Sequence, residues 1–326
     1  MTETIIRRAR IEDAEAIARM VTALSDAEGG PAPHFDAAIC RRDGFGPAPR
    51  FEALLAEIDG RPAGYALYHP SYDTDRVVPA VWLADLYVES WARRQGLGRR
   101  LAAKVASLAR AKGDRGMHWG VLRNNALARE FYSQFGREDD SLLHCFMAEA
   151  IVARLAKSSS LSPAAIRPAA RLSDTALLGG FLSKLLISLG EEPLGFDAGP
   201  RLAADGFGAD PRFGAVIAEI EEDPAGYALF WPIYDTETGG PLMFLSDLLV
   251  EEEHRGRGVA EDLMAAVARQ AVAAGHLGMA WEVMRRNRRA RAFYRHLAEE
   301  SDKEITVNCA GEDFERLAAE EIPTLL

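Results

Sequence analysis

The residues with the most definite chemical use form two glycine-rich turns. Arg93-x-x-Gly96-x-Gly98 follows an apolar run, and Arg255-x-x-Gly258-x-Ala260 stands 162 positions later. Small residues let backbone N–H groups turn inward, and a helix that starts there adds its positive end. Each turn therefore predicts a socket for pyrophosphate. A Walker A loop is excluded because no Gly-Lys-Ser/Thr follows, and a Rossmann fingerprint because a hairpin precedes the turn.

A carboxylate, an asparagine and a tyrosine recur around each turn at the same separation. They are Asp85, Asn125 and Tyr132 in the first copy and Asp247, Asn287 and Tyr294 in the second. A carboxylate can accept a proton, and a phenol of pKa about 10 can donate one at pH 7. Structural interpretations stand beside these: the aspartates satisfy backbone donors at a strand irregularity or bind a substrate cation, the asparagines cap helices, and the tyrosines belong to the core.

These residues belong to a duplicated domain. From the region of Gly44 to that of Tyr132 the motifs recur with a constant offset of 162 residues, so one backbone plan occurs twice. This period is far longer than that of a solenoid, so each copy is expected to bury its own core. The polar, proline-containing segment 158–163 is typical of a linker. We therefore predict domains at 1–157 and 164–326.

The elements that position these residues follow one order in each copy. In the first, strands are expected at 4–8, 51–58, 63–68, 81–88, 117–122 and 142–147, with Asp59-Gly60 turning a hairpin. Helices are expected after Asp13, which could cap the first of them, after the glycine-rich turn, and over 125–135. A hairpin followed by a strand-helix-strand crossover predicts an α/β (α+β) fold. Each domain then has a mixed, mostly antiparallel sheet with helices on both faces.

With this context, each copy resembles the GNAT acyltransferase family over nearly its whole length. The glycine-rich turn and the later Asn and Tyr carry the resemblance. The runs Gly64-Tyr65-Ala66-Leu67 and Asp85-Leu86-Tyr87-Val88 look like the branch that acetylates diamines, namely the spermidine/spermine and thialysine N-acetyltransferases. That branch has Glu directly before the Asp, whereas this chain has Ala84 and Ser246. The departure leaves the substrate and the proton acceptor open.

The resemblance implies which residues hold coenzyme A. In the first copy these are Leu86, Tyr87, Val88, Arg93, Arg94, Gln95, Gly96, Leu97, Gly98, Arg99, Asn125 and Ala128. In the second they are Leu248, Leu249, Val250, Arg255, Gly256, Arg257, Gly258, Val259, Ala260, Glu261, Asn287 and Ala290. Backbone N–H groups of the strand before each turn would bind the pantetheine arm and polarise the thioester carbonyl.

The resemblance also implies a reaction. Acetyl-CoA would acetylate a primary amine of a small molecule, such as a diamine, a polyamine or a lysine-like compound, by direct attack through a tetrahedral intermediate. Tyr132 and Tyr294 would protonate the leaving thiolate, and Asp85 and Asp247 are the nearest carboxylates for the amine. The alternatives are a non-catalytic acyl-CoA-binding regulatory module and a protein or peptide acetyltransferase. Two coenzyme sites are expected first, and one active copy with a structural partner second. The copies are also expected to pack as a pseudo-dimer.

Composition bounds the remaining function classes. Residues 1–157 hold 22 Lys and Arg against 21 Asp and Glu, and the rest hold 16 against 28, so the net charge of −11 lies in the second copy. An acidic chain is a poor nucleic-acid binder. Its acidic surface either attracts cationic molecules or serves solubility alone. We expect no metal site, no membrane segment, reduced cysteines and a cytoplasmic protein.

Overall fold

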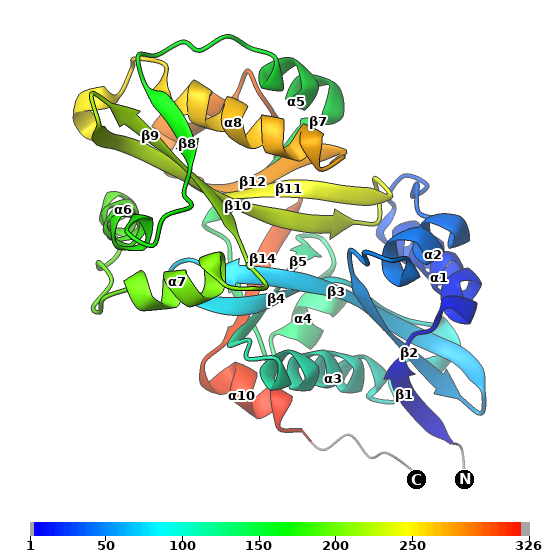
Figure 1. Ribbon diagram of the computed structural model, residues 1–326. Coiled ribbons are helices and arrows are strands. Elements are labelled where there is room, and N and C mark those ends of the chain that lie inside the picture. Colours follow the sequence, from blue (N-terminus) through cyan, green and yellow to red (C-terminus); the bar gives the residue numbers. More distant parts are fainter. Residues whose placement is uncertain (1–2, 321–326) are drawn as a thin grey trace.

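The computed structural model describes residues 3–320, which form two seven-stranded mixed sheets (Figure 1). The first copy contains β1 (Thr4–Arg8), α1 (Ala14–Glu28), α2 (Ala37–Phe45), β2 (Glu52–Ile58), β3 (Arg61–Asp73), β4 (Val78–Val88), α3 (Leu97–Ala111), β5 (Gly116–Leu122), α4 (Ala126–Tyr132), β6 (Arg137–Asp139), β7 (Leu142–Ala148) and α5 (Glu149–Ala156). The predicted fold class, with mixed sheets and helices on both faces, is confirmed.

The second copy repeats this order. It contains β8 (Ala165–Pro168), α6 (Asp174–Ser188), α7 (Gly199–Phe207), β9 (Gly214–Ile220), β10 (Asp223–Asp235), β11 (Gly240–Val250), α8 (Val259–Ala273), β12 (Gly278–Met284), α9 (Arg288–Tyr294), β13 (Glu299–Ser301), β14 (Glu304–Ala310) and α10 (Glu312–Ala318). Short 3-10 turns precede α1, α3 and α8, at Ile11–Asp13, Ser90–Ala92 and Glu252–His254.

Two local expectations need adjustment. Asp13 directly precedes α1, but its carboxylate accepts hydrogen bonds from Arg7 and from the backbone N–H of Arg10 and does not cap α1. The helix expected over 125–135 ends at Tyr132. The Asp59-Gly60 hairpin is present, with φ of 49° and 75°, the left-handed backbone that this turn chemistry favours.

The two sheets exchange their last long strands. β7 pairs antiparallel with β12 of the second copy, and β14 pairs antiparallel with β5 of the first. The sheet orders are therefore β1-β2-β3-β4-β5-β14-β6 and β13-β7-β12-β11-β10-β9-β8. Figure 1 shows the red β14 lying beside the cyan and green strands of the first copy. The segment 158–163 separates the repeats in the sequence, whereas the sheets mix residues from both sides of it.

The exchanged strands bring their helices with them. Phe314 and Leu317 of α10 pack in the same core as Leu101 and Val105 of α3, and Val152 of α5 packs with Leu263 of α8. Figure 1 shows α10 beside α3 at one end of the molecule and α5 beside α8 at the other. Each half of the molecule thus depends on the other for one wall of its core.

Tyrosines at the ends of the long hairpins form further contacts between the two copies. The Tyr234 hydroxyl donates to Asp43 of α2 at 2.8 Å, and the Tyr72 hydroxyl donates to Asp205 of α7 at 3.0 Å. The ring of Tyr234 packs 4.7 Å from that of Phe51. Equivalent residues make equivalent contacts, so the halves are related by an approximate two-fold arrangement. Within residues 3–320 no helix is long and apolar enough to cross a membrane.

Candidate active site

A β-bulge places the repeated aspartate in each half. Leu67 lies opposite Asp85 while Tyr68 lies opposite Leu83, so Ala84 is the extra residue of β4. The same shift makes Ser246 the extra residue of β11, next to Asp247. A bulge re-aims the neighbouring side chain and increases the local twist. The position where the family resemblance leads one to expect Glu is therefore the bulged residue itself.

Beyond the bulge, β4 separates from its parallel neighbour. β4 and β5 pair at only two positions, Val81 with Met117 and Trp82 with His118, although β4 continues to Val88. The second half opens in the same way after Phe244 and Ala280. The edge of β4 from Leu86 to Val88 is thus not paired with β5. Its backbone groups can bind a ligand that enters between the strands, as expected for Leu86, Tyr87 and Val88.

The first glycine-rich turn leads directly into α3. Gly96 has φ of 75° and precedes the first helical residue, Leu97, and a Cβ at Gly96 would meet no atom within 4 Å. Arg94 also has positive φ, 63°. In the first turn of α3, the Nε of Arg100 is buried without a hydrogen-bond partner among residues 3–320. Open space and free helix N–H groups at the turn fit an anionic group such as pyrophosphate.

The arginine that opens each motif has a structural task. Arg93 Nε donates to the carbonyl oxygen of Val88 at 2.9 Å, and Arg255 Nε donates to that of Val250 at 2.9 Å. These bonds hold the turn against the end of the preceding strand. Gly256 and Gly258 reproduce the backbone of the first turn, with φ of 72° and 84°, but Leu161 of the linker lies against Gly258.

Asp85 is buried and receives hydrogen bonds from both halves of the molecule. Its Oδ2 accepts from the Tyr65 hydroxyl at 2.9 Å and its Oδ1 from the Thr236 hydroxyl at 3.2 Å. Burial raises the pKa of Asp85 to about 6, although both hydroxyls favour the ionised form. Asp85 therefore changes its charge just below neutral pH.

Asp247 has the reciprocal arrangement. It accepts from Tyr227 at 3.0 Å, from Ser246 at 2.9 Å and from Thr74 of the first half at 3.2 Å. Burial, followed by the charge of Asp75, raises the pKa of Asp247 to about 7. Among residues 3–320, both aspartates accept hydrogen bonds from hydroxyl groups and from no backbone N–H of the bulge, which excludes the alternative that they satisfy backbone donors there.

The repeated tyrosines pack on the repeated tryptophans. The ring of Tyr132 lies 5.0 Å from that of Trp119, and the ring of Tyr294 lies 4.9 Å from that of Trp281. Burial raises the pKa of Tyr132 above its ordinary value, and the charges of Glu28 and Asp85 raise it further. Tyr132 is thus a neutral phenol at physiological pH, which a proton donor must be.

The repeated asparagines cap helices. Asn125 accepts from the backbone N–H of Ala128 at 3.1 Å, and Asn287 accepts from that of Ala290 at 3.0 Å. Each bond starts the helix that carries the tyrosine. The structure therefore confirms that the asparagines cap helices. The cap at Asn125 helps to position the helix that carries Tyr132.

A cavity of about 910 Å³ lies between the halves. Asp85 and Tyr132 line it, whereas Asp247 and Tyr294 are not among its lining residues. Eleven carboxylates from both copies line it: Glu28, Asp73, Asp75, Asp85, Asp139, Asp235, Glu237, Glu282, Glu304, Glu312 and Asp313. The lining arginines are Arg76 and Arg137. The cavity therefore has a strongly negative potential and favours a cation.

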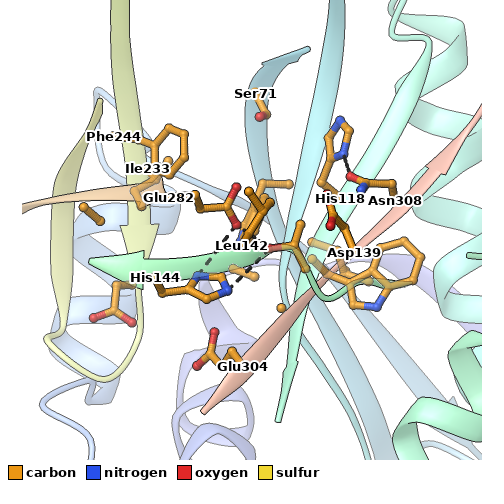
Figure 2. Close-up of a pocket in the computed structure, with 18 of the residues that line it drawn as sticks. Ser71, His118, Asp139, Leu142, His144, Ile233, Phe244, Glu282, Glu304 and Asn308 are labelled. Carbon is orange, nitrogen blue, oxygen red and sulfur yellow. Dashed lines mark hydrogen bonds and ion pairs between the residues drawn. The ribbon is translucent and has the colours of Figure 1, made fainter. Parts of the chain in front are cut away.

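The exchanged strands supply the middle of this wall (Figure 2). Glu304 of β14 approaches β5 so closely that a Cβ at Gly120 would lie 2.7 Å from its Oε2. Glu282 accepts from the Thr306 hydroxyl and lies 3.7 Å from His144 Nδ1. His144 Nε2 and the Thr306 hydroxyl, from equivalent positions of β7 and β14, lie 3.4 Å apart. The approximate two-fold axis passes between them.

Sequence reasoning missed these wall residues. Glu304 stands where the first copy has Leu142, and Glu282 where it has Gly120, so each is a charge present in one copy only. This difference between the copies is visible in the sequence. Only the strand exchange shows that Glu304 and Glu282 lie on the cavity wall. The variable loops 25–50 and 188–212 are what the sequence by itself suggests as acceptor walls. Ser25, Glu28 and Pro33 do line the cavity, and no residue of 188–212 does.

Comparison with known proteins gives consistent matches. A family model described as the acetyltransferase (GNAT) family matches residues 18–136 and 185–298. Thialysine N-epsilon-acetyltransferase of Bos taurus is 32% identical over 161 residues, 46% of this chain and 94% of that protein. The Mus musculus protein of the same name is 35% identical over 148 residues, 43% and 86%.

Two solved structures share the whole architecture. One is a tandem GNAT protein from the clavulanic acid biosynthesis pathway, with a TM-score of 0.51 and 14% identity over 94% of this chain and 98% of that one. The other is a GCN5-related N-acetyltransferase from Sphaerobacter thermophilus, with a TM-score of 0.50 and 18% identity over 94% and 95%. At these identities the likeness concerns the fold alone.

Proposed function

The chain belongs to the GNAT family of acetyltransferases, and from this premise we propose that it transfers the acetyl group of acetyl-CoA to a primary amine of a small cationic molecule. One observation carries the proposal. Asp85, Leu86 and Tyr132 line the same acidic cavity, where β4 separates from β5. The residues that could bind the amine, the acyl donor and the leaving group therefore converge.

The coenzyme-binding residues of the first half follow from this arrangement. The N–H groups at the start of α3, beginning with Gly96 to Arg99, would bind the pyrophosphate, and the free edge of Leu86 to Val88 would bind the pantetheine arm. When bound, acetyl-CoA supplies an activated acyl group. The chain's part is to hold the thioester carbonyl against backbone donors of β4 and to present it to the cavity.

The acceptor enters as an alkylammonium ion and must lose a proton before it reacts. With a pKa near 10.4, only about one molecule in a thousand is neutral at pH 7. Glu28 and Asp85 line the cavity and can take that proton. Glu28 is exposed at the cavity, and partial desolvation there, followed by the charges of Asp85, Glu304 and Glu237, raises its pKa to about 7. Glu28 thus provides a carboxylate that does not depend on the missing Glu of the bulge.

The bond changes balance with these groups. The amine nitrogen forms a bond to the thioester carbonyl carbon, the carbon–sulfur bond breaks, and the sulfur leaves as a thiolate. The first proton from the ammonium goes to a cavity carboxylate, and the Tyr132 hydroxyl gives its proton to the thiolate. The second proton, which the nitrogen loses as the amide forms, restores the Tyr132 hydroxyl. Relatives named thialysine N-epsilon-acetyltransferase support the proposal that the acceptor is a small, lysine-like amine.

Release of free thiol from acetyl-CoA tests the proposal. The panel contains monoamines, diamines, triamines, lysine-like amino acids and a lysine peptide. We expect turnover with small amines that carry a second positive charge and weaker turnover with neutral-tailed monoamines. Coenzyme binding without turnover on any amine would contradict the proposal in favour of a binding module, and turnover on the peptide alone would favour a protein acetyltransferase.

A further inference from the structure

The linker between the repeats packs on the second glycine-rich turn. A Cβ built at Gly258 would lie 2.8 Å from both the Cβ and the carbonyl oxygen of Leu161. At the equivalent residue of the first half, Gly96, the same construction meets nothing within 4 Å. The two turns share their backbone angles, so the difference lies in what covers them. The space next to the turn that is open at Gly96 in the first half contains Leu161 at Gly258 in the second.

A buried carboxylate fixes the linker in this place. Asp262, in the first turn of α8, accepts from the backbone N–H of Leu161 at 2.9 Å and from that of Ser162 at 3.0 Å. The hydroxyls of Ser160 and Ser162 also donate to it, the former at 2.8 Å. Burial alone would raise the pKa of Asp262, but these hydrogen bonds outweigh it and hold the pKa below its usual range. Asp262 is therefore an anion at neutral pH.

The charges of the two helix starts are opposite. α3 has Arg99 and Arg100 in its first turn, whereas α8 has Glu261 and Asp262 at the equivalent positions. The N-terminus of a helix attracts anions. Acidic side chains at that end already interact favourably with the helix dipole, and they repel a second anion. Asp262 thus binds the linker with its carboxylate at the start of α8, where the first half presents an arginine.

We propose that the linker closes the second turn, so that the chain has one coenzyme site, in its first half. The second half then serves that site: Thr236 contacts Asp85, and Glu237 and Glu304 line the acceptor cavity. This inference rests on the proposed use of acetyl-CoA. It replaces the expectation of two coenzyme sites with the expectation of one active copy and one supporting copy.

Calorimetric titration of the full chain with acetyl-CoA tests the inference. One equivalent per chain supports it, and two equivalents overturn it while leaving the proposed function intact. The absence of any binding overturns the proposed function and this inference together. Gln95→Glu and Arg257→Glu place an acidic side chain at equivalent exposed positions of the two turns. We expect Gln95→Glu to weaken binding about fivefold or more and Arg257→Glu to leave the affinity unchanged.

Arg269→Glu, at an exposed position near the far end of α8, carries the same charge change as Arg257→Glu and should leave the affinity unchanged. If Arg257→Glu weakens binding while Arg269→Glu does not, the inference is overturned. Hydrogen exchange gives a second readout that does not depend on variants. Acetyl-CoA should slow exchange in a peptide that covers 95–100 and leave 257–262 unchanged. Slowing in both peptides would overturn the inference.

Discussion

The hydroxyl of Thr236 donates a 3.2 Å hydrogen bond to Asp85 Oδ1, which joins the second half of the chain to the candidate catalytic carboxylate of the first. Thr74 makes the reciprocal bond to Asp247 at 3.2 Å. Both threonines end the long hairpins that cross between the halves. The candidate site of the first half therefore contains residues from both repeats.

This contact predicts an asymmetric effect of two equivalent substitutions. The Thr236 hydroxyl favours ionised Asp85, so Thr236→Val should raise the pH at which kcat/KM falls on the acid side and lower kcat/KM at pH 7 by a few-fold. Thr74→Val, the matched change at Asp247, should leave the pH profile of kcat/KM unmoved. Equal shifts in both variants would contradict a single active first half.

Substitution of the two repeated tyrosines should also affect catalysis more in the first half than in the second. Tyr132→Phe removes the proposed proton donor and should lower kcat by about a hundredfold with little change in KM, the lower range for a general acid. Tyr294→Phe makes the same change on Trp281 of the second half and should leave kcat within about twofold. Steady-state kinetics and thermal melts of both variants provide the measurement. A larger loss in Tyr294→Phe would place catalysis in the other half.

The acid limb of the pH profile follows from two carboxylates. Glu28 and Asp85 have pKa values raised to about 7 and about 6, so both are ionised above pH 8 and protonated below pH 5. We expect kcat/KM to fall as the pH drops through 7 and then 6. Glu28→Gln should lower kcat/KM at pH 8 and move the remaining limb towards pH 6. A limb that stays at pH 7 in this variant would assign it to another group.

Burial of Asp85 also affects stability in a defined pH window. Because its pKa is higher in the folded chain than in the unfolded one, folding is favoured at low pH and this contribution is lost as the pH rises from about 4 to about 6. Asp85→Asn, which cannot ionise, should therefore gain stability relative to the parent between pH 4 and pH 8, by up to about 3 kcal/mol. Unfolding measured at both pH values checks this; no change in the difference would contradict the raised pKa.

Glu304 should act on the acceptor alone. It lines the cavity but belongs to β14 of the second copy. Glu304→Gln keeps the shape and removes one charge, so the KM of a dicationic amine should rise several-fold while the KM of acetyl-CoA stays constant. Glu253→Gln, an exposed carboxylate outside the cavity wall, is the control. A rise in the KM of acetyl-CoA would place Glu304 in the coenzyme site instead.

The exchanged strands predict how a cleaved chain behaves. A protease site inserted after Lys157 would separate the repeats covalently, but β7 and β14 would still be paired in the opposite sheets. The two fragments should therefore co-elute on size exclusion at high salt and separate only in denaturant. Separation under native conditions would contradict the exchange.

Much of the molecule could be predicted from its sequence. The 162-residue repeat, the Asp-Gly hairpin, the glycine-rich turns and the Asn and Tyr after them are local patterns, because turn chemistry, capping and alternation act between residues close in the chain. They predicted the fold class, the family and part of the candidate site, including the asparagine caps that the structure shows at Ala128 and Ala290.

Only the tertiary structure decided which copy contributes which residue. A strand pattern reports that one face of β14 is buried but not against which neighbour, and β5 and β12 are equivalent partners in a duplicated chain. The exchange places Glu304 in the first site, and the packing of the linker places Leu161 on Gly258. Both depend on contacts between residues more than ninety positions apart, which local physical chemistry does not specify.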